Sequence, residues 1–282
     1  MRDISGQAAD KEFLRSIADN GYELPEDIDA FTFARALLPN FASLDGEMRD
    51  ELSYMILASG IVDKHKLDKE QLKTLLSTVL DADHLFFHIG ENETDTVFMR
   101  SFSNLIIAAI LYSDAKKPEL SETMIQQTKA ALLRYAQEER DWRGYIEGKG
   151  WAHAMAHLAD ALDECAQSRT MTMDDRKEIM EIICALARLS VPLYHEEDVR
   201  LATVAYHVIL GKQADDEFLN SWVEACFVPR DSDVVSWTRG ANAKNFLRSL
   251  YFLLYWAAAA PVLTEHISSV LKRQDDVYIE IK

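Results

Sequence analysis

The stretch Asn104–Tyr112, NLIIAAILY, is apolar on every side of the helix that its composition predicts. A helix without a polar face is expected to be buried at the centre of a helical protein. Elsewhere, apolar residues recur at helical spacing along most of the chain. The 282 residues include only 10 Gly and 6 Pro, about half the average usage, which indicates few tight turns. The sequence therefore predicts an all-α fold.

About a dozen helices follow from this periodicity and from the capping residues beside it. Their predicted ranges are 9–20, 26–38, 45–61, 68–81, 95–113, 119–139, 150–167, 173–190, 197–210, 214–227, 242–259 and 261–273. Because the connections are short, consecutive helices are expected to pack antiparallel. A helix pair has about the length of a HEAT or armadillo unit. We predict an α-α superhelix of about six such pairs, HEAT/armadillo-like, with an irregular toroid or bundle as the alternative.

The domain prediction is a single domain over residues 1–282, because no Gly/Ser linker divides the chain. Residues 1–8 and 275–282 are predicted to be frayed tails. The last residues, 277–282, alternate apolar and polar side chains. A short strand is the alternative there, and a frayed tail is favoured because no partner strand is evident.

The chain carries 30 Lys+Arg and 47 Asp+Glu, a formal charge of −17. This excess argues against nucleic acid and against an anionic membrane as partners. The longest uncharged run, Ser249–Thr264, is broken by Pro261 and is too short to favour a membrane span. Three distant cysteines, Cys165, Cys184 and Cys226, have the pattern of reduced core thiols. With an N-terminus unlike a secretory signal, these features predict a cytoplasmic protein.

The segment most suggestive of function is Arg140–Glu164, RDWRGYIEGKGWAHAMAHLADALDE. Its glycines and tryptophans cluster: Trp142, Gly144, Gly148, Gly150 and Trp151. In a chain poor in glycine, such clustering marks backbone that turns tightly or approaches another group closely. The free N–H groups of a following helix, with Lys149, are suited to an anion. A rigid loop packed by two indoles is the interpretation that we favour.

His153 and His157 are spaced i, i+4 in the predicted helix 150–167, and Asp160 lies on the same stripe. The large apolar residues fall near the opposite face, so the stripe is expected to face solvent or a groove. These three side chains are suited to hold a metal ion with one open position. The motif lacks the glutamate of zinc proteases, and we favour a polar helix face supported by neighbouring side chains. No cofactor is predicted.

The sequence resembles a bacterial family of uncharacterised helical proteins, domain-of-unknown-function family 2785. The resemblance rests mainly on RGYIEGKGWAHAMAHLADALDE, residues 143–164. Three shorter stretches follow the order that the family shows: MRDELSY (48–54), TVFMRSFS (96–103) and HEEDVRLA (195–202). The resemblance implies a HEAT-like superhelix and a meeting of the four stretches on one face. It implies no activity and assigns no catalytic residue.

We predict a polar groove that binds a protein or a small ligand. Its candidate residues are Arg143, Tyr145, Glu147, Lys149, Trp151, His153, His157 and Asp160, with Arg100 and Glu196 as further contributors. Arg100 lies in an otherwise apolar helix, so a carboxylate partner is expected for it. The alternative is an enzyme, metal-dependent through His153, His157 and Asp160 or acid–base through His153 with Glu147.

Overall fold

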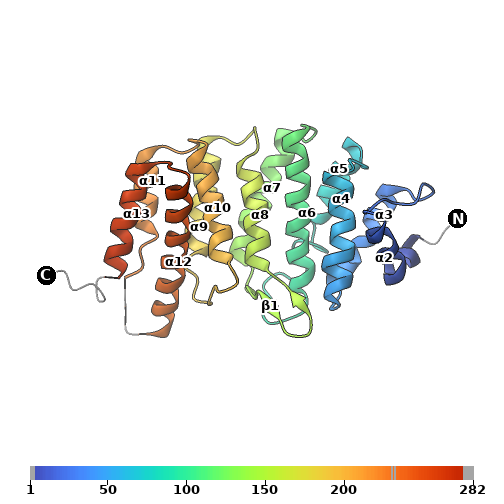
Figure 1. Ribbon diagram of the computed structural model, residues 1–282, viewed down its shortest axis with the longest axis horizontal. Helices are drawn as coiled ribbons and strands as arrows, with labels where there is room; N and C mark the ends of the chain where they lie inside the picture. Colours follow the sequence, from blue (N-terminus) through green and yellow to red (C-terminus); the bar gives the residue numbers. More distant parts are fainter. Residues whose placement is uncertain (1–3, 230, 232, 276–282) are drawn as a thin grey trace. The chain divides into compact units, whose positions relative to one another are not determined.

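The computed structural model describes residues 4–229, 231 and 233–275 (Figure 1). Helices make up nearly all the regular structure of these residues, which confirms the all-α prediction. By its contacts the chain divides into two compact units, Met1–Cys165 and Ala166–Lys282, and each is described by itself. The single domain and the HEAT-like superhelix stay predictions. The predicted tail or strand at 277–282 lies outside the described residues.

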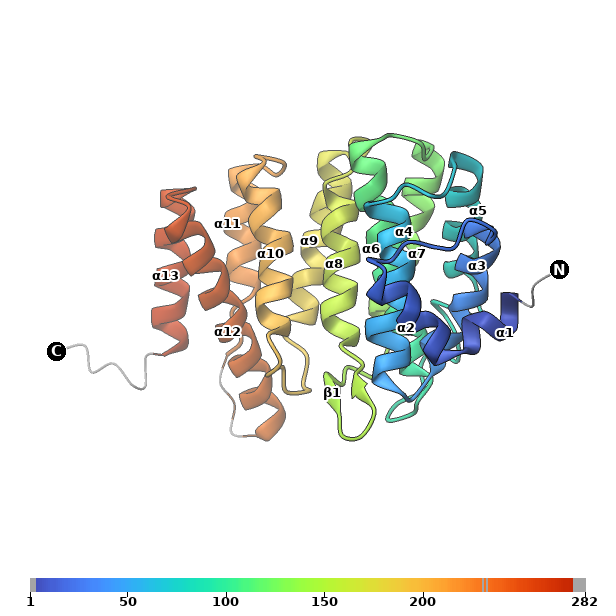
Figure 2. The same cartoon turned by 45° about the vertical axis from the view of Figure 1, so that its right-hand side comes forward.

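In its described residues, the first unit combines α-helices with one 3-10 helix, one π-helix and one β-hairpin. In chain order its helices are α1 (Ile4–Ala9), α2 (Lys11–Asp19), α3 (Ala30–Leu37), the 3-10 helix η1 (Leu38–Ala42), the π-helix η2 (Glu47–Tyr54), α4 (Met55–Val62), α5 (Lys69–Val79), α6 (Val97–Lys116), α7 (Glu122–Glu138) and α8 (Ala154–Ala166). The hairpin joins α7 to α8 through the strands β1 (Tyr145–Ile146) and β2 (Gly150–Trp151). Figure 2 shows it beyond the N-terminal end of α8.

Helix α6 forms the core of the first unit. Every residue from Val97 to Leu111 except Leu105 is buried, which confirms the predicted central helix. The helices α4, α5 and η1 pack against α6. Because its sequence offers no polar face, α6 is stable only when other helices cover all its sides. It provides the fixed framework beside which the hairpin is placed.

Helix starts carry the caps that the sequence indicates. The Asp68 carboxylate accepts from the Gln71 amide, and the Gln71 side chain accepts from the Asp68 amide, both at 2.9 Å. This confirms the capping box predicted for α5. Thr172 and Asp175 form a second capping box at the start of α9. Such caps satisfy amide groups that a helix leaves without partners at its first turn.

Several helix starts in the first unit differ from the predicted ones, among them that of α3, which begins at Ala30 and not at 26. The predicted range 9–20 is divided at Asp10, whose carboxylate caps α2, and α1 runs from Ile4, inside the predicted tail 1–8, to Ala9. The predicted range 150–167 becomes helical only at Ala154. Gly150 (φ +86°) and His153 (φ +46°) have left-handed backbone conformations, which a right-handed helix excludes.

The second unit contains five helices within the described residues: α9 (Met173–Leu186), α10 (Glu197–Leu210), α11 (Asp216–Ala225), α12 (Val234–Trp256) and α13 (Pro261–Gln274). Helix α12 packs against α10 and α13, and α9 packs against α10 and α11. The predicted start of α12 at 242 is wrong, because Asp233 caps the helix through the Ser236 amide at 2.9 Å. None of the helices among the described residues is long and apolar enough to cross a membrane.

Candidate functional site

The segment that the sequence analysis singled out forms a short antiparallel hairpin. Tyr145 pairs with Trp151, and Ile146 pairs with Gly150. The amide of Lys149 donates to the carbonyl of Ile146 at 3.0 Å and closes the turn. Two residues on each strand make few ladder hydrogen bonds, so a hairpin of this size needs support from the rest of the protein.

The glycine cluster builds this hairpin and does not form an anion site at a helix start. Gly148 (φ +73°) lies in the turn, and Gly150 has the left-handed conformation noted above. The following helix starts only at Ala154, away from the turn. The Lys149 ammonium donates to both carboxylate oxygens of Asp95, at 2.6 and 2.8 Å. A rigid connection therefore describes this segment better than the anion site, but the packing by two indoles holds only for Trp142, because Trp151 is 39% exposed.

The buried side chain of Arg49, in η2, holds the hairpin in place. Its Nη2 donates to the carbonyls of Lys149 and Trp151, at 3.0 and 3.3 Å. Its Nη1 donates to the carbonyl of Ser43 at 2.7 Å. The guanidinium carbon lies 4.0 Å from the centroid of the Phe98 ring, a cation–π contact. Arg49 is fully buried, so these partners take the place of water around its charge.

The neighbouring Asp50 supplies the countercharge. Its Oδ1 lies 2.6 Å from Nε of Arg49. Burial raises the pKa of Asp50 to about 6, although the Arg49 charge acts in the opposite direction. A carboxyl group with this pKa is suited to acid–base catalysis near neutral pH. Its observed contact is with Arg49, so we assign it to the support of the hairpin.

Five rings form a row from the hairpin surface to the core of the first unit. The Tyr145 and Trp151 rings meet edge to face at 5.0 Å, and Trp151 stacks on His153 at 4.1 Å between centroids. His153 contacts His157 at 5.8 Å, and His157 contacts Phe102 at 5.2 Å. The exposed fraction falls along the row, from 46% at Tyr145 and 39% at Trp151 to 2% at Phe102.

His157 is bound from the core side. The hydroxyl of Ser101 donates to the carbonyl of Ala152, so its oxygen accepts from Nδ1 of His157 at 2.7 Å. A hydroxyl has one proton, so this arrangement places a proton on Nδ1 of His157. The predicted polar stripe is corrected here: His157 is buried, and His153 precedes the helix. Asp160 is half-buried on α8.

Neither enzyme alternative is supported by a contact among the described residues. Among the described residues, no group of three or more His, Cys, Asp or Glu side chains is placed to hold a metal ion. The metal alternative through His153, His157 and Asp160 therefore gains no support from the described residues and stays a hypothesis. Glu147 is exposed in the hairpin turn, and within the described part of the chain its carboxylate forms no hydrogen bond or ion pair. The acid–base pair of His153 with Glu147 is therefore not formed.

Two arginines predicted for the groove are held by internal partners. Nε and Nη2 of Arg143 bind the Asp141 carboxylate at 2.7 and 2.6 Å, and Nη2 also donates to the Thr94 carbonyl at 2.7 Å. Nε and Nη2 of Arg100 bind the Glu139 carboxylate at 2.6 and 2.9 Å. The expected carboxylate partner of Arg100 is confirmed. Both members of this second pair are fully buried, so Arg100 lines no exposed groove.

Glu196 lies in the second unit. It is exposed and precedes α10 with a left-handed backbone (φ +65°). The carboxylate of its neighbour Glu197 accepts from the His195 amide at 2.7 Å. Acidic side chains at a helix start are stabilised by the positive end of the helix dipole. The position of Glu196 is therefore explained by its place at the start of α10.

Three of the four family-like stretches meet in the first unit. Arg49 of MRDELSY contacts Phe98 of TVFMRSFS and the carbonyl of Lys149 in the hairpin. Ser101 binds His157. This confirms the expected meeting for these three stretches, while HEEDVRLA lies in the other unit.

Sequence reasoning did not identify Arg49 as part of the site. The only signal for it was its place in a family-like stretch, since its partner Lys149 is 100 positions away.

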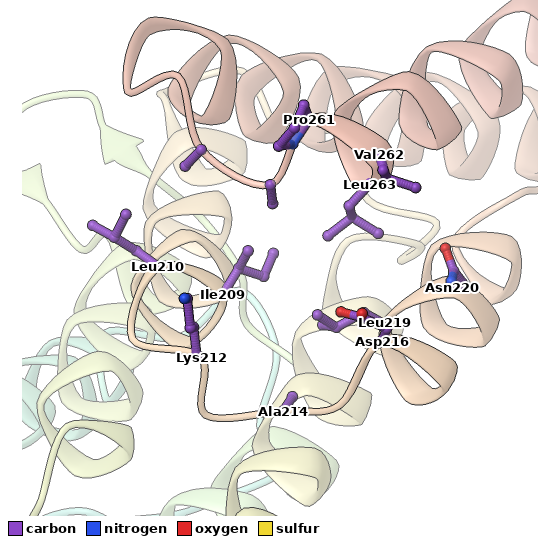
Figure 3. A pocket seen from close by; sticks show the side chains of 12 residues that line it. Ile209, Leu210, Lys212, Ala214, Asp216, Leu219, Asn220, Pro261, Val262 and Leu263 are labelled. Carbon is purple, nitrogen blue, oxygen red and sulfur yellow. The ribbon is translucent and has the colours of Figure 1, made fainter.

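The second unit contains an apolar cavity of about 600 Å³ (Figure 3). Its lining residues are Ile209, Leu210, Lys212, Ala214, Asp216, Leu219, Asn220, Ala259, Ala260, Pro261, Val262 and Leu263. Lys212 and Asp216 bring polar atoms to opposite sides of it. Lys212 (φ +52°) and Ala260 (φ +41°) have left-handed backbones, a strained state for residues with a Cβ. Its size and apolar walls are typical of small-molecule sites.

A family model described as "Protein of unknown function (DUF2785)" matches residues 85–252. The chain belongs to this family. The matched range includes α6, the hairpin and the cavity wall from α10 and α11. No curated protein and no solved structure matches the chain. The DUF2785 family has no known function, so the role of this member has to be argued from its geometry.

Proposed function

We propose that this DUF2785 protein is a binding protein whose hairpin docks a polypeptide partner with exposed Lys or Arg side chains. We call residues 144–153 the aromatic hairpin. The exposed ring pair of Tyr145 and Trp151, on backbone held by Arg49, is the observation that carries the proposal. Tyrosine and tryptophan bring large contact areas with few rotatable bonds, and they dominate binding hot spots for that reason.

Rigidity of the aromatic hairpin supports this role. Arg49 holds two of its carbonyls, and the Lys149 ammonium joins its turn to Asp95. Arg143, at its base, is bound to the carbonyl of Thr94. Side chains that are already fixed lose little freedom when a partner binds, so more of their contact energy appears as affinity.

Charge selects the partner class. Residues 1–165 include 17 basic and 30 acidic side chains, a net charge of −13, whereas residues 166–282 include 13 and 17, a net charge of −4. Glu147 is exposed in the turn between the two strands that carry the rings. A Lys or Arg side chain on Tyr145 or Trp151 gains a cation–π contact and the attraction of Glu147. The same field disfavours nucleic acid and anionic membranes.

We also propose a HEAT-like architecture and a cytoplasmic location for this protein. Two pairs of consecutive helices pack on each other in the second unit, α9 with α10 and α12 with α13, which supports HEAT-like helix pairs there. All three cysteines are buried and unbridged, which supports a reducing, cytoplasmic location.

The test is calorimetric titration of the full chain with a peptide of alternating lysine and alanine. The arginine analogue is titrated in parallel, and the glutamate analogue serves as the charge-reversed peptide. The double variant Tyr145→Ser/Trp151→Ser is compared with Tyr255→Ser/Trp256→Ser. This control pair has the same composition and is also exposed, on or near the end of α12. Loss of a hot spot of about 2 kcal/mol corresponds to a roughly 30-fold weaker Kd.

We expect that weakening for the hairpin variant only, with the control within about two-fold of the unmodified chain. Salt should weaken the lysine complex, because the attraction by the first unit is long-range. Equal affinity of the two double variants for the lysine peptide would contradict the proposal. So would a failure of the unmodified chain to prefer the lysine peptide over the glutamate peptide.

The cavity favours a second candidate function, the binding of a small apolar ligand. Nine of its twelve lining residues are apolar. Leu210 and Val262 are both substantially exposed at its walls, where their contact with water is unfavourable. A ligand that covers them would recover that energy.

Val262→Asp tests this second candidate, with Val234→Asp as a matched control. The two valines are 78% and 80% exposed and lie in the first turns of α13 and α12, where an added acid is equally acceptable to the helix. The probe is the neutral dye Nile red, whose fluorescence rises in apolar sites. We expect reduced fluorescence for Val262→Asp only. Equal fluorescence in both variants would rule out the cavity as the binding site.

A further inference from the structure

We propose that Cys184 and Cys226 form an oxidisable dithiol, a modification site at which hydrogen peroxide generates an intramolecular disulfide. Cys184 lies in α9, and Cys226 directly follows α11. Their Sγ atoms are 3.1 Å apart. A covalent disulfide has a length of about 2.05 Å, so the sulfurs have to approach by about 1 Å. Small side-chain rotations provide a movement of that size.

Contacts on both sides of the pair fix the spacing of the two chain segments. One turn before the thiols, Nε1 of Trp222 donates to the carbonyl of Met180 at 2.6 Å. One turn after Cys184, Nη1 of Arg188 donates to the carbonyl of Ala225 at 2.6 Å, and its Nε donates to the carbonyl of Cys184 at 3.2 Å. The thiols are thus held in contact by hydrogen bonds that do not involve sulfur.

The environment gives the two thiols different roles. Cys226 donates its thiol proton toward the Cys184 sulfur, and this hydrogen bond lowers the pKa of Cys184. The positive charge of Arg188 acts in the same direction. Burial raises the pKa of the Cys226 thiol well above its usual value. Because thiolate is the reactive form, Cys184 is the group that attacks the oxidant and Cys226 is the group that resolves the product.

The reaction has two balanced steps. The Cys184 thiolate attacks one oxygen of hydrogen peroxide, an S–O bond forms, and the O–O bond breaks. The released hydroxide takes up the proton that Cys184 has lost and leaves as water. The sulfur of Cys226 then attacks the Cys184 sulfenic acid, so that an S–S bond forms and the S–O bond breaks. The hydroxyl leaves with the Cys226 proton as a second water. Two thiols are oxidised by two electrons, and one peroxide is reduced to two waters.

Access limits the oxidant to a small molecule. Both cysteines are buried. A hollow of about 400 Å³ is lined in part by Arg188, Phe227 and Val228. Phe227 and Val228 directly follow Cys226 in the sequence. Hydrogen peroxide is close to water in size, which makes it the kind of oxidant that can reach a buried thiol. A bulky oxidant such as a glutathione disulfide is excluded from direct attack by the burial of Cys184.

The disulfide would join residues 42 positions apart in the second unit. A cross-link of this span restricts the unfolded chain, so the oxidised protein is expected to melt at a higher temperature than the reduced one. The site shares no residue with the aromatic hairpin. Its test is therefore independent of the proposed binding function.

The experiment uses the full chain, fully reduced and then treated with hydrogen peroxide. Intact mass, thiol titration and a peptide map of the alkylated protein are measured. Cys165→Ser removes the third cysteine and keeps the pair, and Cys226→Ser removes the resolving thiol. We expect the unmodified chain and Cys165→Ser each to lose two hydrogens and two thiols, with Cys184 linked to Cys226 in the map. A reductant should reverse the change, and Tm should rise by several degrees on oxidation.

Cys226→Ser is expected to retain one oxygen on Cys184 and to react there with dimedone, which captures sulfenic acids. If this variant does not fold, the comparison of the unmodified chain with Cys165→Ser carries the test. Three intact thiols after peroxide treatment would overturn the proposal. Oxygen retained on Cys184 of the unmodified chain, or a cross-link only between molecules, would also overturn it.

Discussion

A Cβ atom at Gly150 would lie 3.1 Å from Nη2 of Arg49, closer than side chains normally approach. The guanidinium has little room to withdraw, because Nη2 is bound to the carbonyls of Lys149 and Trp151. The absence of a side chain at residue 150 and the buried arginine therefore depend on each other. This relationship joins η2 to the aromatic hairpin and determines where the exposed rings stand.

Gly150→Ala is expected to destabilise the chain more than Gly148→Ala. Both glycines have left-handed backbones, so each substitution introduces strain of about 1 kcal/mol. A Cβ at Gly148 meets nothing within 4 Å, whereas a Cβ at Gly150 also displaces Arg49. The expected losses in the free energy of unfolding are about 1 kcal/mol and about 2–3 kcal/mol, respectively. Urea unfolding measures both, and equal losses would show that Arg49 does not hold the hairpin.

The buried ion pair gives a second prediction. Glu139→Gln leaves the fully buried Arg100 charge without its countercharge, at an expected loss of about 3–5 kcal/mol. The adjacent Glu138→Gln removes an exposed i,i+4 pair with Arg134 and should change stability by less than about 0.5 kcal/mol. The two substitutions are chemically identical and adjacent in sequence. Thermal or urea unfolding compares them, and a loss below about 1 kcal/mol for Glu139→Gln would contradict a structural role for the pair.

Local pattern determined which parts of this structure the sequence could predict. The helix α6 was predictable because consecutive apolar residues in its sequence indicate burial on every side. The partner of Arg100 was predictable in kind, since a buried cation requires a carboxylate, but Glu139 is 39 positions away and had no local signal. The start of α12 was missed because its first turns, from Val234, include exposed apolar residues that obscure the helical period.

The hairpin was harder to predict than the helices. Each strand has only two residues, and such short strands have no alternating pattern to detect. The glycine cluster indicated an unusual backbone but not its shape. The helical wheel that placed His153 beside His157 and Asp160 assumed a helix from 150. Positive φ at His153 breaks that assumption, and the two histidines meet through ring contact instead.

Glu47 and Asp50 of η2 predict pH effects of opposite sign. Hydrogen bonds from Arg15 and then Lys11 lower the pKa of Glu47 to about 2, so its contribution to stability is full above pH 4.5 and is lost as the pH falls toward 2. Burial raises the pKa of Asp50 to about 6 from 3.8. The folded chain binds this proton more tightly than the unfolded chain, so the contribution of Asp50 is full below pH 3.8 and is lost as the pH rises through 6.

The measurement is the free energy of unfolding against pH for Glu47→Gln, Asp50→Asn and the unmodified chain. Glu47→Gln should remove part of the acid loss below pH 4.5. Relative to Asp50→Asn, the unmodified chain should lose stability between pH 4 and pH 6. Glu51→Gln, an exposed neighbour, controls for the removal of one negative charge. A difference curve for Asp50→Asn that is flat from pH 4 to pH 6 would contradict the raised pKa.

Ser101 and Ser103 test how the inner end of the ring row is held. Both are fully buried on α6, two residues apart. The Ser101 hydroxyl joins the Ala152 carbonyl to Nδ1 of His157, whereas the Ser103 hydroxyl donates only within its own helix, to the Met99 carbonyl at 2.8 Å. Ser101→Ala removes a partner from two buried polar groups, at about 1–3 kcal/mol. Ser103→Ala leaves a carbonyl that still accepts in the helix, so its cost should be below about 1 kcal/mol.

Nitrogen NMR of the histidine side chains adds a readout that a general loss of stability would not change. In the unmodified chain the Ser101 oxygen accepts from Nδ1 of His157, so this nitrogen should carry a proton while the ring is neutral. Ser101→Ala removes that acceptor and should shift the proton toward Nε2, the form that neutral histidine generally prefers. Ser103→Ala should leave the His157 signals unchanged. Because His157 contacts His153, which stacks on Trp151, a change of tautomer without a change at Trp151 would show that the contacts of Arg49 and Lys149, and not His157, hold the outer rings.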